Sequence, residues 1–354
     1  MKKVAMIEYQ GRCDLEGNAV GHAPKVLEEY HDFIKEFCEV EIFAPEVICR
    51  NLTDALCGKC RQLPKTIVMK GHNSFLEKIN NKLHMFTNLK KAFADTDADI
   101  IWLFNTEYYL MLYLFFHKKP KQKLVLTMFL DGYHGNTVAK FKQWVFERAQ
   151  KKMDLILASG EHFEFKNCAS RFIPDYYYKP EKYETYRLQE KKEQAVCLGT
   201  MSSGKKLEEL VEAFNQNGYP LIIAGRFYEK ERFANLKKAA NQNITLRDCY
   251  LSEEEYYRLL SSSRYTVLPY DEEVYGTQTS GVMQEAMFLD VVPVANAKVL
   301  KAGSIPGVAF ADYAELGKMD FSISLEAYYR DYEKLREQNY CLEKIRTAYR
   351  EVFQ

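Results

Sequence analysis

The chain has 354 residues, of which 47% are hydrophobic and 28% are charged, a composition typical of a globular protein with more than one hydrophobic core. Its 49 Lys and Arg residues balance 49 Asp and Glu residues, which argues against nucleic acid as the main partner. The longest apolar run, YYLMLYLFF at 108–116, is too short to span a bilayer, and the start of the chain is unlike a signal peptide, so we expect a cytoplasmic protein.

The first half of the chain alternates short apolar runs with helical patterns. The expected strands cover 2–9, 40–45, 98–105, 123–130 and 154–159. The expected helices cover 23–37, 75–93, 107–117 and 138–152. Regular alternation of strands and helices predicts a parallel, doubly wound sheet, here a first Rossmann-like domain over residues 1–175.

A tyrosine-rich, charged stretch with Pro174 and Pro180 follows, and we expect a linker over 176–192. The alternation then restarts with strands at 195–200, 220–225, 244–250, 265–270 and 291–296. Helices are expected at 205–216, 229–242 and 252–263, and another begins near Gly281.

The second half thus predicts a further Rossmann-like domain over 193–330, which gives an α/β fold with two doubly wound parallel sheets facing a cleft. The last segment, 331–354, is a tyrosine-rich helix whose apolar residues fit packing on another surface. The first domain is one candidate for that surface.

Nine cysteines, scattered and odd in number, favour free thiols in a reducing compartment. CGKC at 57–60 has a metal-like spacing, but no second pair stands at a suitable distance. DTDAD at 95–99 contains an Asp-x-Asp pattern, yet it precedes a strand and so falls at the wrong edge of the sheet for a ligand site. We therefore expect no obligatory metal and no cofactor.

A small-residue turn leads into an apolar helix at 275–287, YGTQTSGVMQEAM, after a strand that ends at Tyr270. Ligands of parallel sheets bind beyond the carboxyl ends of the strands, and a helix start offers N–H groups and a positive dipole to a phosphate. Thr279 and Ser280 add hydroxyl donors, and Glu285 can accept hydrogen bonds from a ribose diol. A plain turn with a serine cap and an exposed glutamate is the alternative for this motif taken alone.

The segment LGTMSSGKKLEELVEAF at 198–214 repeats this arrangement after the first strand of the second half. Gly199 ends the strand, and Lys205 or Lys206 begins the helix, where a cation is unfavourable unless an anion is bound. Two such helix starts in one sheet predict a diphosphate ligand.

These two motifs, with PLIIAGR at 220–226 and the run 244–270, resemble the nucleotide-sugar domain of the B-type glycosyltransferases, in particular the large retaining family 4. The motifs stand in the family's order, whereas the first half matches it only in pattern. The resemblance implies that a sugar passes from a nucleoside diphosphate sugar to a glycan or lipid-linked acceptor in bacterial-type polysaccharide or glycoconjugate synthesis.

The resemblance also implies roles for single residues. Lys205 and the backbone of Ser280 and Gly281 would hold the donor diphosphate, and Glu285 would take the ribose hydroxyls. The other donor-side positions would be Gly199, Thr200, Arg226, Thr279, Tyr250 and Leu251, with Gly17 and Gly21 in the loop 17–22 of the first domain.

The chain departs from the family at two positions. Thr200 stands where an arginine is frequent, and Thr277 stands where the first of two paired glutamates is usual. Charge compensation for the diphosphate then falls on Lys205 and Arg226.

DGYHG at 131–135 follows an expected strand of the first domain. His134 would contact the donor sugar, and Asp131 would be the base if the reaction inverts. In a retaining enzyme of this kind the leaving phosphate helps to deprotonate the acceptor, so no protein base is required. An aspartate that caps a turn and a surface histidine are the alternatives, and Glu107 and Glu161 are lesser candidates.

Two other functions stay open: a nucleotide-sugar epimerase or hydrolase on the same fold, and a non-catalytic nucleotide-sugar-binding subunit. The departures at Thr200 and Thr277 favour the second of these. Basic runs at 46–91 and 117–123, next to the aromatic segment 108–116, fit shallow contact with an anionic membrane at the cytoplasmic face. Solvated surfaces and a core helix are the alternative interpretations.

Overall fold

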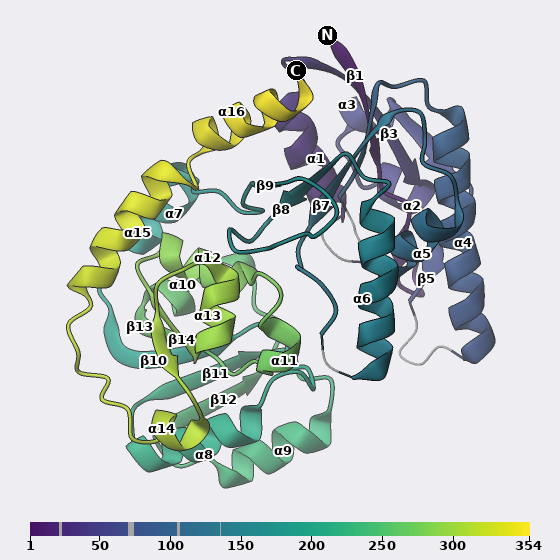
Figure 1. The fold of residues 1–354 in the computed structure, drawn as a ribbon. Helices are drawn as coiled ribbons and strands as arrows, with labels where there is room; N and C mark the ends of the chain where they lie inside the picture. Colours follow the sequence, from purple (N-terminus) through teal and green to yellow (C-terminus); the bar gives the residue numbers. More distant parts are fainter. Residues whose placement is uncertain (21–22, 70–73, 105–106, 135) are drawn as a thin grey trace. The chain divides into compact units, whose positions relative to one another are not determined.

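The computed structural model describes residues 1–20, 23–69, 74–104, 107–134 and 136–354 (Figure 1). These residues form two compact units. Unit 1 comprises Met1–Ser159, Phe163–Ile173 and Ile345–Gln354, and unit 2 comprises Gly160–His162 and Pro174–Lys344. The segment 176–192, expected as a linker, lies within unit 2, where helix α7 (Pro180–Arg187) buries Tyr183 in the core.

Unit 1 is built on a parallel sheet with seven strands among the described residues, in the order β4-β3-β1-β6-β7-β8-β9. The strands are β1 (Lys2–Ile7), β3 (Cys38–Pro45), β4 (Cys60–Leu63), β6 (Ile100–Leu103), β7 (Lys123–Met128), β8 (Leu155–Ala158) and β9 (Ser170–Phe172). Two short strands, β2 (Arg12–Cys13) and β5 (Ile67–Val68), pair separately. The parallel pairing agrees with the alternation read from the sequence.

Helices α4 (Phe75–Asp95), α5 (Tyr108–Phe116) and α6 (Thr137–Gln150) share one core with the strands of unit 1. The aromatic helix α5 lies between the other two and buries Leu110, Met111 and Leu114. Of the two interpretations of this segment, the core helix is therefore the one that the structure shows.

Helices α1 (Ala23–Ile34) and α16 (Leu342–Phe353) pack around Trp102 of β6. The ring of Trp102 lies 4.8 Å from Tyr30 of α1 and 5.3 Å from Tyr349 of α16, between ring centroids. The surface that receives the C-terminal helix thus belongs to unit 1.

Two short helices, α2 (Glu46–Cys49) and α3 (Asp54–Cys57), precede β4. Cys49 and Cys60 form a disulfide between α2 and β4, with their Cα atoms 6.0 Å apart. The expectation of free thiols is therefore wrong for this pair. Because Cys60 is bonded to Cys49, CGKC does not offer two thiols to a metal.

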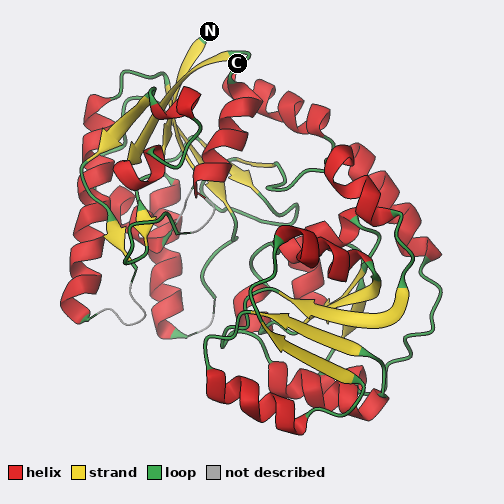
Figure 2. Cartoon of the chain, turned by 180° about the vertical axis from the view of Figure 1, so that it is seen from behind, coloured by secondary structure: helices red, strands yellow, loops and turns green. Residues whose placement is uncertain are grey.

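Unit 2 contains a parallel sheet with six strands in its described part, in the order β12-β11-β10-β13-β14-β15. The strands are β10 (Lys192–Leu198), β11 (Leu221–Gly225), β12 (Ile244–Asp248), β13 (Ser263–Leu268), β14 (Val292–Asn296) and β15 (Val308–Phe310). The helices after α7 are α8 (Leu207–Asn217), α9 (Lys230–Ala239), α10 (Glu253–Ser261), α11 (Glu272–Tyr275), α12 (Gly281–Phe288), α13 (Ala297–Gly303), α14 (Tyr313–Leu316) and α15 (Glu326–Gln338). Figure 2 shows helices on both faces of this sheet.

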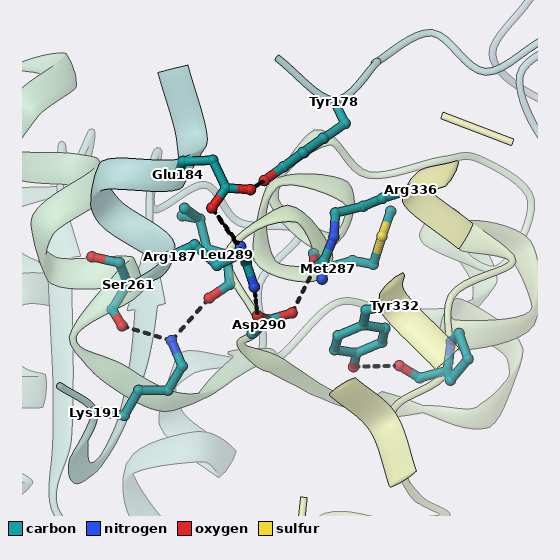
Figure 3. Close-up of polar contacts among 11 residues, drawn as sticks. Tyr178, Glu184, Arg187, Lys191, Ser261, Met287, Leu289, Asp290, Tyr332 and Arg336 are labelled. Carbon is teal, nitrogen blue, oxygen red and sulfur yellow. Dashed lines mark hydrogen bonds and ion pairs between the residues drawn. The ribbon is translucent and has the colours of Figure 1, made fainter. Parts of the chain in front are cut away.

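A charged network ties α7, α12 and α15 together in unit 2 (Figure 3). Asp290, just after α12, accepts from Arg336 of α15 at 2.6 Å and from Arg187 of α7 at 3.1 Å. Arg336 also donates to the carbonyl of Met287 at 2.9 Å. Lys191 lies in the same view. It donates to the carbonyl of Ser261, the last residue of α10, and to that of Leu289, just after α12, each at 2.9 Å. Cations at helix C-termini stabilise the negative ends of the helix dipoles.

We predict that Asp290→Asn destabilises unit 2 by about 3–5 kcal/mol, because it leaves the buried Arg336 guanidinium without its carboxylate. Asparagine tolerates the positive φ of 54° at this position, so the substitution isolates the charge. Urea unfolding of the two proteins checks this prediction. Asp331→Asn, in an exposed pair with Lys334, is the control and should change the free energy of unfolding by less than about 0.5 kcal/mol. Equal effects of both substitutions would contradict the prediction.

Candidate functional site

The candidate site of unit 2 lies where its strand order reverses. The chain leaves β10 towards β11 and leaves β13 towards β14, although β10 and β13 are neighbours. Open parallel sheets bind ligands at such a switch point, beyond the carboxyl ends of the strands. The loops that follow are residues 199–206 and 269–280, the same two segments that the sequence singles out for a diphosphate.

Backbone hydrogen bonds hold these two loops together. The amide of Lys206 donates to the carbonyl of Pro269 at 2.7 Å, and the amide of Asp271 donates to the carbonyl of Gly204 at 3.1 Å. Lys205 and Tyr270 form an antiparallel bridge between them. The structure thus brings both predicted helix starts to one place.

Glycine is required where the loops after β10 and β11 meet. Gly199 has a φ of 96° and Gly225 a φ of 151°, both in the region that favours glycine. A Cβ atom on Gly225 would lie 1.8 Å from the carbonyl oxygen of Gly199. A side chain would therefore clash at Gly225 and strain the backbone at Gly199.

The lysines at the start of α8 are both engaged. Lys205 is buried and donates from Nζ to the carbonyl of Leu198 at 2.9 Å, and burial lowers the pKa of its ammonium group. Lys206 forms an ion pair with Glu272 at 2.8 Å. An anion at this loop would favour the charged form of Lys205, because an opposite charge offsets desolvation.

Four other predicted donor-side residues lie around the loops. Thr200 follows Gly199 and is exposed. Arg226 follows β11, is exposed, and has its guanidinium 6.0 Å from the ring of Tyr228. Tyr250 follows β12 and is 86% exposed, so its ring is available to a base, while Leu251 beside it is half-buried.

Helix α12 begins at the second loop. Its N-cap residue, Ser280, makes no side-chain cap hydrogen bond and instead shares one with Tyr270 Oη at 3.3 Å. Gly281 is the first helical residue, and a Cβ atom there would lie 2.6 Å from the hydroxyl of Tyr176. The positive end of the α12 dipole is therefore bordered by two tyrosines, whose hydroxyls can donate to an anion.

Glu285 of α12 is held by two tyrosines of α10 that the sequence did not point to. Tyr256 donates to one carboxylate oxygen at 2.8 Å, and Tyr257 donates to the other at 2.6 Å. Burial, and then the charge of Glu285, raise the pKa of both tyrosines, so they stay protonated donors. A carboxylate has about four acceptor positions, so a ribose diol would have to use those that remain.

Two further residues shape the loops and were missed by the sequence analysis. Arg232 of α9 donates to the carbonyls of Ser202 and Lys205 at 2.9 and 2.7 Å. Asp175 accepts from Nε2 of Gln284 at 2.8 Å, next to the start of α12. Arg232 and Asp175 belong to no sequence motif, because the groups that they contact are far away in the chain.

In unit 1, Asp131 and His134 lie just beyond β7. Nε2 of His134 is 3.2 Å from Oδ1 of Asp131, and burial raises the pKa of the Asp131 carboxyl. Gly17 lies in a turn in which Oδ1 of Asp14 accepts from the amides of Glu16 and Asn18. Glu107 forms an ion pair with Arg12. Gly21 lies outside the described residues.

A cavity of about 610 Å³ opens elsewhere in unit 2, lined by Lys191, Glu193, Arg264 and Asp290 among others. These residues stand at the amino ends of β10, β13 and β14, so the cavity is at the edge of the sheet opposite the predicted loops.

Over the described ranges, no group of three or more His, Cys, Asp or Glu side chains is arranged to hold a metal ion. In DTDAD, Asp97 pairs with Lys3, and Asp99 accepts from the Lys3 amide at 2.9 Å. Over the same ranges, no helix combines the length and the apolar character that crossing a membrane requires. That the protein needs no metal stays a prediction.

No protein-family model and no curated protein matches the chain. Solved structures do match over its length. Sucrose-phosphate synthase from Thermosynechococcus elongatus superposes with a TM-score of 0.66 at 14% identity, covering 100% of this chain and 99% of that one. HepE from Anabaena, in complex with UDP and glucose, has a TM-score of 0.63 at 13% identity and covers 99% of both chains. The UDP-forming trehalose-phosphate synthase from Burkholderia vietnamiensis has a TM-score of 0.64 at 10% identity, with 100% and 99% covered.

The chain has the B-type glycosyltransferase fold. At these identities the likeness concerns the fold. In this chain, the loops 199–206 and 269–280 and the start of α12 meet at the switch point of unit 2.

We predict that Arg232→Met destabilises unit 2 by about 1.5–3 kcal/mol, because two carbonyls of the loop 202–205 lose a charged donor. Arg258→Met removes an exposed cation of α10 and should cost less than about 0.5 kcal/mol. Unfolding in urea, followed for both variants, measures the difference. The role given to Arg232 fails if the two variants lose the same stability.

We predict a pH dependence from Asp175. Burial raises the pKa of this carboxyl from 3.8 to about 6, so the folded state binds the proton more tightly than the unfolded state. The stabilisation from Asp175 is fully present below pH 3.8 and is lost as the pH rises through 6.

Asp175→Asn should therefore gain stability relative to the natural protein between pH 4 and pH 7, by at most roughly 3 kcal/mol. Urea unfolding at these two pH values gives the comparison. A difference that does not change between pH 4 and pH 7 would contradict the role given to Asp175.

Proposed function

We propose that this protein is a glycosyltransferase that takes a sugar from a nucleoside diphosphate sugar. The observation that carries the proposal is the meeting of the loops 199–206 and 269–280 at the switch point of unit 2, beside the start of α12. Support comes from the B-type fold and from the UDP in the HepE structure, which favours a uridine nucleotide for this chain as well.

In this proposal the diphosphate lies at the start of α12, where Gly281 and the hydroxyl of Ser280 offer donors. Transfer needs stabilisation of the leaving diphosphate as the glycosidic bond breaks, and fixed donors with a helix dipole supply it. Lys205 and Arg226 provide the positive charge. Lys205 would turn its ammonium from the Leu198 carbonyl towards the phosphate.

Glu285 is proposed to bind the ribose. Its carboxylate is already oriented by Tyr256 and Tyr257, so little side-chain freedom would be lost on binding. Tyr250 and Leu251 would border the base. Gly199 and Thr200 would line the phosphate side of the pocket, and Thr279 would add a hydroxyl.

Asp131 and His134 are proposed for the chemistry at the sugar. Their 3.2 Å contact and the raised pKa of the Asp131 carboxyl fit a proton acceptor, which an inverting reaction requires. We propose that the reaction retains the configuration of the sugar. The leaving phosphate then accepts the proton from the acceptor, and His134 contacts the sugar. The acceptor is a glycan or a lipid-linked glycan of polysaccharide synthesis, reached at the cytoplasmic face of a membrane.

Two observations favour a non-catalytic donor-binding subunit as the second candidate. Glu272 already neutralises Lys206, and Thr200 and Thr277 replace family side chains that contact the donor. Such a subunit would bind the nucleotide sugar without turning it over. An epimerase or hydrolase would instead release a product without an acceptor, so product analysis separates all three.

We predict that a UDP-sugar or GDP-sugar at 100 times its dissociation constant stabilises unit 2 by about 2.7 kcal/mol, which raises its unfolding midpoint by roughly 5–10 °C. Glu285→Gln should weaken nucleotide binding roughly 10- to 100-fold, because a charged hydrogen-bond acceptor is lost. Glu254→Gln, on the exposed side of α10, is the matched control and should bind as the natural protein does.

Thermal unfolding with a panel of nucleoside diphosphate sugars measures the stabilisation. Calorimetry measures the affinity of the natural protein and of the two variants. A flat response to every nucleotide sugar would overturn the proposed function. Binding that is unchanged by Glu285→Gln would leave a nucleotide site but remove Glu285 from it.

A further inference from the structure

The outward face of α6 carries apolar side chains in contact with water. Val138 is 62% exposed, Phe141 56% and Trp144 44%. The inward face of the same helix buries Val145, Phe146 and other residues in the core of unit 1. A helix of a globular protein usually has one apolar face, so the second one requires an explanation.

The apolar surface continues from α6 onto the end of α5. The ring centroid of Trp144 is 5.8 Å from that of Phe141 and 5.3 Å from that of Phe115, and Phe116, next in the chain, is 73% exposed. Lys152 fixes the end of α5 by donating to the carbonyls of Phe115 and His117 at 2.8 and 2.6 Å. We name this continuous surface the aromatic strip and define it by Phe115, Phe116, Val138, Phe141 and Trp144.

Helix α4 adds a second exposed apolar surface to the same layer. Its first turns expose Phe75 and Leu76, each at 76%, and Leu83 at 55%. Helix α5 lies between α4 and α6, which run in the same layer in Figures 1 and 2. Lys82 of α4 and Lys142 of α6 lie over the rings of Tyr109 and Tyr108 at the start of α5, at 4.7 and 5.3 Å.

Positive charge surrounds the aromatic strip. Residues 137–152 contain five Lys or Arg residues and one acidic residue, Glu147, which pairs with Lys166 at 2.8 Å. Residues 117–123, directly after Phe116, contain four lysines and no acidic residue. The guanidinium of Arg148 lies over the ring of Trp144, 5.7 Å from the ring centroid.

Exposed Trp and Phe side chains among Lys and Arg fit one kind of partner. Aromatic rings insert at the headgroup level of a bilayer, and basic side chains bind anionic lipid headgroups. A second protein surface would also cover the apolar side chains, but it gives no reason for a surround in which basic side chains outnumber acidic ones.

We propose that the aromatic strip, together with the first turns of α4, docks unit 1 onto an anionic lipid bilayer. The surface differs from the one expected from the sequence, because only the last two residues of α5, Phe115 and Phe116, contribute to it and the rest of the aromatic strip lies on α6. The proposal concerns unit 1 alone and holds whether or not unit 2 binds a nucleotide sugar.

The two tryptophans of the chain make the test direct. Trp102 is fully buried and donates to the hydroxyl of Thr127, whereas Trp144 lies in the aromatic strip. Vesicles of phosphatidylcholine in which about a third of the lipid is phosphatidylglycerol should shift the tryptophan emission to the blue and should co-sediment with the full chain. Vesicles of phosphatidylcholine alone should do neither, and Trp144→Phe should abolish the shift while co-sedimentation persists.

Variants separate the apolar and the charged contributions. Phe141→Ser with Trp144→Ser should lower binding to the anionic vesicles at least about tenfold, since two aromatic side chains no longer insert. Leu188→Ser, which changes a residue of unit 2 that is 75% exposed, is the matched control and should bind normally. Lys140→Gln with Lys151→Gln should lower binding roughly fivefold for each charge removed. Lys237→Gln with Lys238→Gln on α9 is the control for charge.

Unfolding midpoints and nucleotide binding are measured on the same proteins, so that loss of fold or of the donor site is recognised separately. The proposal is overturned if the natural protein does not bind anionic vesicles. It is also overturned if the serine variant binds them as well as the natural protein. Self-association that the serine variant abolishes, without vesicle binding, would assign the aromatic strip to a second copy of the chain.

Discussion

Strands β10 and β13 are paired in a parallel sheet, yet the chain leaves them in opposite directions. Their two following loops therefore remain side by side at the carboxyl edge, and hydrogen bonds from Lys206 to Pro269 and from Asp271 to Gly204 join them. The loops after β10 and β11 also meet at this edge, where Gly225 lies close to Gly199. Every role proposed for unit 2 follows from this placement, since a ligand of the sheet has its donors here.

The charged side chains of Lys205, Lys206 and Glu285 at this edge have partners before any ligand arrives. Glu272 neutralises Lys206, and burial holds the pKa of Lys205 below its ordinary value. Two tyrosines donate to Glu285, and Asp175 lies close to the start of α12 with a raised pKa. A bound diphosphate would therefore favour the charged form of Lys205 and would bind better with Asp175 protonated than with Asp175 ionised. Binding of such a ligand and protonation of the site are thus coupled.

The sequence predicted the features that depend on local pattern. Alternating strand and helix runs gave two parallel sheets, and glycines with small hydroxyl residues marked both loops of the switch point. Features that depend on distant residues were missed. These are the hydrogen bonds from Arg232 to the loop 202–205, the two tyrosines that donate to Glu285, and the disulfide between Cys49 and Cys60. The linker over 176–192 was expected from its charge, but its tyrosines, such as Tyr183, pack into unit 2. No spacing in one sequence reports such contacts.

Two surfaces of different chemistry emerge, each contained in one unit. Unit 2 offers hydrogen-bond donors around a helix start, suited to an anionic small molecule, and unit 1 offers aromatic rings among cations, suited to a lipid surface. A crystal structure of the chain with bound UDP decides whether unit 2 holds the nucleotide site: the diphosphate should lie at Ser280 and Gly281, with the ribose hydroxyls on Glu285. A nucleotide bound elsewhere, without contact to Glu285, would contradict this assignment.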